Sequence, residues 1–277
     1  MSDRAEAALE RVLLVIDPTQ LVQVALEKAE WIASRNDAEL RLYCCIWDAG
    51  LEDDEAAART VVNNTKAWLE RIAILSREGG LSVTIEVEWH PDWRSQIAAA
   101  AARCDADLII KTAVKHKQLT RQLLRTSDWT LLRDSSCPTL LVNPKQSGDS
   151  SIVLAAIKLT PNDQAHVILN ERVIQMSQRI AVAVGADLHA VTVYKGDDMY
   201  FDRQKFADSC GLARNRVHAA EGAPHRGIAE VSEQIDAGVL VVGCAASQSP
   251  ERGVIIGDTA QRVIDEVAAD VVVVPAA

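Results

Sequence analysis

The residues best placed for chemistry lie near the C-terminus, where two glycines bracket a polar loop. Gly243 directly follows the apolar run 239–242, and Gly257 directly precedes Asp258 and Thr259. Asp258 and Thr259 are of the type that caps helices, and apolar residues then recur at helical spacing. Backbone N–H groups at the start of a helix attract anions, commonly phosphates. The loop therefore predicts a site for a phosphate or another anion.

Two other charged residues each close the first apolar run of one half of the chain. Asp17 follows the run 11–16, and Lys158 follows the run 152–157. Both runs lack polar alternation, which is typical of strands buried on both faces of a parallel sheet. Asp17 and Lys158 are therefore predicted at the ends of buried strands.

The elements that must position these residues occur in an order that repeats along the chain. Apolar strand-like runs alternate with helical patterns, which indicates a parallel α/β sheet. The segment 144–151 is polar and turn-rich, as linkers are. We predict two tandem domains of one fold, residues 1–145 and 151–277. The expected strands are 11–17, 39–47, 81–89, 108–111 and 137–143, and then 152–157, 187–194, 217–220, 239–242 and 271–274.

Composition excludes several classes of protein. The formal net charge of -10 argues against a general nucleic-acid binder, which needs clustered Lys and Arg. No apolar run reaches the ~18 residues of a membrane span, and the polar start of the chain shows no signal peptide. The six cysteines form no C-x-x-C or zinc pattern, so we expect reduced, small apolar side chains in a cytoplasmic protein.

The C-terminal stretch also resembles a known family. A glycine after a buried strand, a variable loop, Gly-polar-Thr-Ala-x-x-Val-Ile and a final strand ending in Val-Pro are similar to the end of a universal stress protein domain. The segments 128–133 (DWTLLR) and 169–171 (LNE) resemble the tandem, or E-type, branch. The resemblance implies two Rossmann-like (HUP) domains, each with a five-stranded parallel sheet flanked by helices. It also implies a pseudo-dimer packed through the final strands, near 138–142 and 270–274.

In the nucleotide-binding members of that family the loop reads G-x2-G-x9-G-[ST] and wraps a triphosphate. Gly243 and Gly257 match two of its glycines, but Ala246 stands at the middle glycine and Asp258 at the Ser/Thr position. Lys158 replaces the acid that contributes to the nucleoside site. We therefore expect a degraded ATP motif, because a Cβ blocks close backbone approach and a carboxylate repels phosphate. ATP binding stays open as an alternative, as does a Lys158–Asp258 ion pair without a ligand.

The first half keeps Asp17, but Lys111 stands in place of the first glycine, so ATP is not expected there. The surrounding loop is basic, and an anionic headgroup or an acidic partner is one interpretation of it. We favour a solvated surface. The basic residues of this loop are Lys111, Lys115, His116, Lys117, Arg121 and Arg125.

All six tryptophans lie in the first half, at positions 31, 47, 68, 89, 93 and 129. Trp47 and Trp89 close two predicted strands, where such sheets open their binding crevice, and Trp93 follows. An amphiphilic ligand with an anionic head is one hypothesis. Filling of the core is the interpretation that we favour.

No catalytic or metal-binding pattern is present, since the histidines show no ligand spacing and neither a G-x-S-x-G nor a Walker motif occurs. We predict a non-enzymatic stress-response protein that acts through ligand-dependent or partner-dependent interactions. The alternatives are an ATP-binding regulator that uses the loop 243–259 and a carrier of a lipophilic anionic ligand in the first half.

Overall fold

The computed structural model of the chain describes residues 8–113, 127–145, 151–159, 163–194, 201–244, 247–249, 253–255 and 258–276. They form two compact units. The N-terminal unit is Leu9–Val142, and the C-terminal unit is Asn143–Ala277 together with Ala8. No helix in these ranges is long and apolar enough to cross a membrane.

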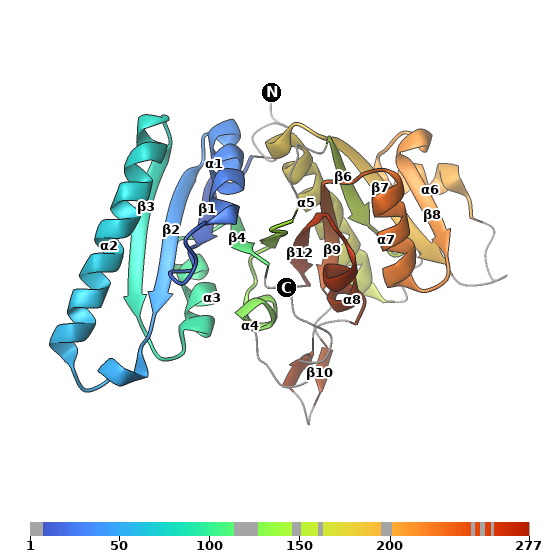
Figure 1. Cartoon of the computed structure of the whole chain (residues 1–277). Helices are drawn as coiled ribbons and strands as arrows, with labels where there is room; N and C mark the ends of the chain where they lie inside the picture. Colours follow the sequence, from blue (N-terminus) through green and yellow to red (C-terminus); the bar gives the residue numbers. More distant parts are fainter. Residues whose placement is uncertain are drawn as a thin grey trace. The chain divides into compact units, whose positions relative to one another are not determined.

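The N-terminal unit holds five parallel strands in the order β3-β2-β1-β4-β5. Figure 1 shows the long α2 lying along β3 at one edge of this sheet. The elements are β1 (Arg11–Val15), α1 (Val24–Asn36), β2 (Glu39–Ile46), α2 (Glu55–Glu78), β3 (Ser82–Trp89), α3 (Trp93–Arg103), β4 (Leu108–Thr112), α4 (Ser127–Asp134) and β5 (Thr139–Val142).

The C-terminal unit repeats this topology with the order β12-β9-β6-β7-β8. Its main elements are β6 (Ile152–Ala156), α5 (Gln164–Val184), β7 (Asp187–Tyr194), α6 (Arg203–Cys210), β8 (Val217–Glu221), α7 (Pro224–Gln234), β9 (Val239–Cys244), α8 (Asp258–Glu266) and β12 (Asp270–Pro275). The predicted fold class, two tandem α/β domains with five-stranded parallel sheets, is confirmed.

Both faces of each sheet are covered by other elements. This follows from the central strands, in which consecutive residues, whose side chains point to opposite faces, are all buried. Leu13 and Ile109 pack with α3 and α4 residues in one cluster, and their neighbours Leu14 and Ile110 are also fully buried. Such strands carry no polar alternation, which is why the apolar runs located them correctly. The same burial makes Cys44, Cys210 and Cys244 part of the core, and none of the six cysteines forms a disulfide.

Local signals set several helix ends. The Asp54 carboxylate accepts from the Ala57 N–H at 2.9 Å at the start of α2, and Asp163 does the same for His166 at the start of α5. Some short elements were not predicted. The connection 195–211 contains the short helix α6, and the loop after β9 contains the antiparallel pair β10 (Ser247–Ser249) and β11 (Gly253–Ile255).

Candidate functional site

The candidate site of each unit lies at the carboxyl ends of two central strands. The chain leaves β1 toward one edge of the sheet and leaves β4 toward the other, and β6 and β9 do the same in the C-terminal unit. Ligands of open α/β sheets bind where the connections diverge in this way. Asp17 and Lys111 flank this point in one unit, and Lys158 and Gly243 flank it in the other.

Lys111 is buried in an ion pair, so its assignment to a solvated basic loop is wrong. Its Nζ lies 2.7 Å from the Asp128 Oδ1 in the first turn of α4, and the two side chains are only 10% and 8% exposed. The same Nζ donates to the Thr112 carbonyl at 3.1 Å. A carboxylate of the protein thus occupies the helix start that attracts anions. The other basic residues of that loop, within 114–126, lie outside the described residues.

Asp17 is exposed and holds its own loop together. Its Oδ1 accepts from the Thr19 N–H at 2.9 Å and from the Thr19 hydroxyl at 2.6 Å. The Gln23 side chain closes the turn, because its Nε2 donates to the Asp17 carbonyl at 2.7 Å. These contacts shape the loop after β1.

Gly243 is required by packing within the C-terminal unit. A Cβ added at this position would lie 2.7 Å from Cγ of Leu169 and 2.9 Å from one of its methyl groups. Leu169 comes from α5 and is itself buried. Because such contacts are far below the normal van der Waals distance, the glycine lets α5 approach β9 closely.

Lys158 is exposed, and its backbone is fixed by Asn170 of α5. The Asn170 Oδ1 accepts from the Lys158 N–H at 3.2 Å, and its Nδ2 donates to the Lys158 carbonyl at 2.8 Å. Thr259 is exposed in the first turn of α8. Ala246, Gly257 and the side chain of Asp258 lie outside the described residues, so a Lys158–Asp258 pair stays a prediction.

The tryptophans at the strand ends of the N-terminal unit are in contact. The rings of Trp47 and Trp89 have centroids 5.3 Å apart and planes tilted by 55°, and both are half-buried. The Arg94 guanidinium lies over the Trp93 ring at 4.4 Å. Trp93 packs against the core cluster under α3 and α4, as expected for a ring that fills the core.

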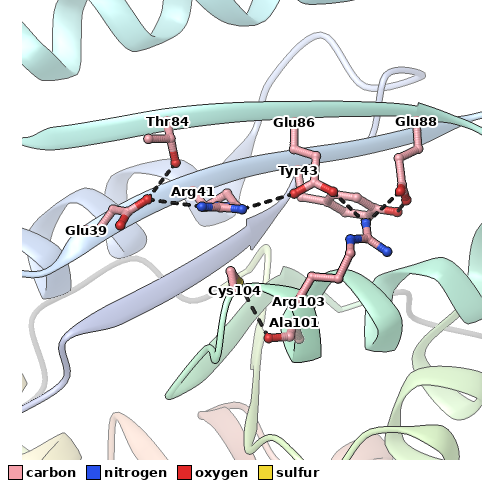
Figure 2. Close-up of polar contacts among 9 residues, drawn as sticks. All are labelled: Glu39, Arg41, Tyr43, Thr84, Glu86, Glu88, Ala101, Arg103 and Cys104. Atoms are coloured by element: carbon pink, nitrogen blue, oxygen red, sulfur yellow. Dashed lines mark hydrogen bonds and ion pairs between the residues drawn. The ribbon is translucent and has the colours of Figure 1, made fainter.

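Sequence reasoning missed a polar cluster on β2 and β3 (Figure 2), although its residues alternate with apolar ones along both strands. Arg103 of α3 bridges Glu86 at 2.5 Å and Glu88 at 2.6 Å. The buried Tyr43 hydroxyl donates to Glu88 at 2.5 Å. Arg41 pairs with Glu86 at 3.3 Å. These contacts tie the edge strand β3 to β2 and α3.

The surroundings of Tyr43 shift the pKa values of two side chains in this region. Burial, followed by the hydrogen bond to Glu88, raises the pKa of the Tyr43 phenol well above its usual range. Burial raises the pKa of the neighbouring Cys45 thiol to about 11. Neither group is therefore ionised near neutral pH, and Cys45 is not an activated nucleophile.

Comparison with known proteins identifies the class that this fold and these strand ends define. The sequence model of the universal stress protein family matches residues 8–143 and 202–275. The chain belongs to the universal stress protein family, whose members act in stress responses.

Its relatives are of the tandem type. Universal stress protein E of Photorhabdus laumondii is 25% identical over 97% of this chain and 95% of its own length. Universal stress protein E of Escherichia coli K12 is 26% identical over 97% of this chain and 94% of its own. The crystal structure of a putative universal stress protein from Pseudomonas aeruginosa has a TM-score of 0.78 at 27% identity, covering 98% of this chain and 95% of that one. The resemblance inferred from the sequence is confirmed.

Proposed function

We propose that this chain is a non-enzymatic stress-response protein that acts through ligand-dependent or partner-dependent interactions, and that its ATP motif is degraded in both domains. The observation that carries the proposal is the buried Lys111–Asp128 pair. It places a protein carboxylate at the helix start where a nucleotide phosphate would need positive potential.

In the N-terminal unit a triphosphate would meet two obstacles. Like charges at close range repel, so a phosphate beside the Asp128 carboxylate is disfavoured. The Lys111 ammonium is already engaged by Asp128 and by the Thr112 carbonyl, so it has little left to offer an incoming anion. Asp17 is the remaining residue of the family pattern, and its carboxylate already accepts a hydrogen bond from the Thr19 hydroxyl.

In the C-terminal unit the first glycine of the family loop, Gly243, has a packing role that is unrelated to phosphate binding. Gly243 is needed so that Leu169 can pack against β9. A glycine required by packing stays in place after ligand chemistry is lost. Lys158 and Asp258 depart from the nucleotide-binding pattern in charge, and Ala246 departs from it in size.

The test is calorimetry of the full chain with Mg²⁺ and ATP, together with an assay for phosphate release. We expect neither heat nor phosphate from the native chain. A triple variant, Ala246→Gly, Asp258→Ser and Lys158→Asp, restores the family pattern and should gain affinity if these residues disable the site. Micromolar ATP binding by the native chain that is lost in Gly257→Trp would overturn the proposal. That result would establish an ATP-binding regulator.

A second candidate function is supported by the tryptophans and by the loop after β1. Trp47 and Trp89 touch at the ends of β2 and β3. Leu21 and Val22, in the loop after the neighbouring strand β1, are 100% and 74% exposed. Apolar side chains at the carboxyl ends of three adjacent strands suit the tail of an amphiphilic anion.

The amphiphile hypothesis is tested on purified protein by two measurements. Mass spectrometry of an organic extract should reveal an acyl compound, and dodecyl phosphate should change the tryptophan fluorescence with saturation. Trp89→Leu should weaken that response, whereas Trp31→Leu, on α1, should leave it unchanged. An empty extract with no saturable response would exclude this function.

The remaining parts of the proposal concern organisation. Domains 1–145 and 151–277 are proposed to form a pseudo-dimer through their final strands, and the same strands are candidates for self-association. Sedimentation of the full chain, with and without cell extract of low molecular mass, tests whether a ligand changes its association. A cytoplasmic location is likewise proposed, and fractionation of cells tests it.

A further inference from the structure

The outer strand of the N-terminal unit, β3, pairs with β2 along one edge, and no other strand of the described residues pairs with its second edge (Figure 1). In a strand, the backbone N–H and C=O of one residue point to the same side, and the side alternates from residue to residue. The His90 N–H donates to the Ile46 carbonyl of β2, so the even-numbered residues face β2. Val83, Ile85 and Val87 therefore direct their backbone groups to the second edge, which we call the free edge.

Arg77, near the end of α2, covers part of the free edge. Its Nε donates to the Val83 carbonyl at 2.9 Å, and its Nη1 lies 2.8 Å from Oε2 of Glu70, which is also on α2. The guanidinium thus lies where a further strand would place a backbone N–H. Unpaired strand edges are templates for pairing with another chain, and proteins protect them with charged side chains. The contact between Arg77 and Val83 is of this protective kind.

The residues of β3 that face the free edge are self-complementary. When two copies of β3 run antiparallel with Ile85 opposite Ile85, Val83 of each copy lies opposite Val87 of the other. The two residues of each such pair face one another with both backbone groups, so they exchange both N–H···O bonds. All the side chains that meet are β-branched, and such pairs pack well in sheets.

The charged residues of β3 select this register. Thr84, Glu86 and Glu88 alternate with the apolar residues and point to the opposite face of the sheet (Figure 2). In the register described above, Thr84 lies opposite Glu86 and Ser82 opposite Glu88, so no two carboxylates are directly opposed. Moving the centre one or two residues toward the C-terminus would place Glu86 opposite a glutamate of the other copy. Like charges that are directly opposite destabilise a sheet.

We propose that the free edge of β3 is a surface for self-association with a second copy of this chain, and that Arg77 keeps this edge closed. Antiparallel pairing needs the Val83 carbonyl of each copy to accept from the Val87 N–H of the other. Arg77 already occupies that acceptor in both copies, so both guanidinium groups must leave before the ladder is complete. The outer strand of the C-terminal unit, β8, has 5 residues against 8 in β3 and offers a shorter edge.

The test is sedimentation velocity of the full chain over a range of concentrations, with Arg77→Ala as the main variant. This substitution frees the Val83 carbonyl in both copies, and each hydrogen bond gained contributes a factor of roughly 2–10. We therefore expect Arg77→Ala to dimerise at least about 5-fold more tightly than the native chain. Glu70→Gln is the matched control, because glutamine can still accept from the Arg77 guanidinium and the contact with Val83 stays. It should associate as the native chain does.

Two additions to Arg77→Ala identify the edge and the register. Val87→Pro removes an N–H that points away from β2, so the ladder with β2 stays intact and the gained association should disappear. Ser82 is exposed and lies opposite Glu88 of the second copy, so Ser82→Glu should weaken the association and Ser82→Lys should strengthen it. Ser34→Glu adds the same charge on α1, away from β3, and should have no effect.

Circular dichroism confirms that each variant is folded, and the Ser82 variants keep the test decisive if Val87→Pro does not fold. Association through the final strands would respond to none of these substitutions. The proposal is overturned if Arg77→Ala sediments as the native chain does at every concentration. It is equally overturned if folded Val87→Pro leaves the association intact, or if Ser82→Glu and Ser82→Lys have the same effect.

Discussion

Substitution of Lys111 by methionine tests whether the buried pair with Asp128 is a structural replacement for an anion. Both side chains are about nine-tenths buried and lie 2.7 Å apart. Removing one partner of a buried ion pair costs roughly 3–5 kcal/mol, because the other charge stays desolvated. The start of α4 stabilises the Asp128 carboxylate by up to about 2 kcal/mol. We therefore expect Lys111→Met to lower the free energy of unfolding of the N-terminal unit by about 3 kcal/mol.

The assay is urea unfolding followed by tryptophan fluorescence. All six tryptophans lie in the N-terminal unit, so the signal reports on that unit alone. With a denaturant dependence of roughly 1–3 kcal/mol per M, the midpoint should fall by 1 M or more. Arg59→Met is the matched control, because Arg59 pairs with Glu55 at the surface, where both side chains are mostly exposed. Its effect should be below about 1 kcal/mol.

A double variant, Lys111→Met with Asp128→Leu, provides the decisive comparison. It removes both charges, and such replacements are often neutral in stability. We expect it to regain most of the loss caused by Lys111→Met. The reasoning is refuted if Lys111→Met costs no more than the surface control, or if the two substitutions add without any recovery.

Two other predictions concern the C-terminal unit. Gly243→Ala should cost about 1–3 kcal/mol, because the new methyl group would meet Leu169, and Leu169→Ala should relieve part of that cost; urea unfolding followed by circular dichroism measures both. The stability of this unit should also fall on acidification through pH 6.5, because the fold lowers the pKa values of His189 and His218, whose ring nitrogens lie 2.9 Å apart on β7 and β8. Below pH 6.5 the unfolded chain therefore binds more protons than the folded chain. Urea unfolding at pH 7.5 and at pH 5.5 measures this loss of stability. The double variant His189→Gln with His218→Gln should show a smaller loss between the two pH values. A change in stability with pH above 6.5 would come from other groups. The charged groups that act on these two histidines are Asp187, Arg216 and Arg203.

Much of the candidate site could be located from the sequence, but the roles of its residues could not. Asp17, Lys158 and Gly243 were predicted at strand ends and are found there. The packing role of Gly243 depends on Leu169, which is 74 positions away, and no local pattern indicates that contact. Lys111 was read as part of a basic surface because its neighbours in the sequence are basic. Its partner Asp128 is 17 positions away and reaches it through the fold.

The sequence by itself determined the strand–helix alternation, the internal repeat and the family, because buried parallel strands and helix ends leave local, periodic signals. Only the tertiary structure decided which polar side chains meet. The contact between His189 and His218, the Lys111–Asp128 pair and the cluster around Tyr43 each join residues from different elements. Strand register and helix packing set these contacts, and both result from burial across the whole unit.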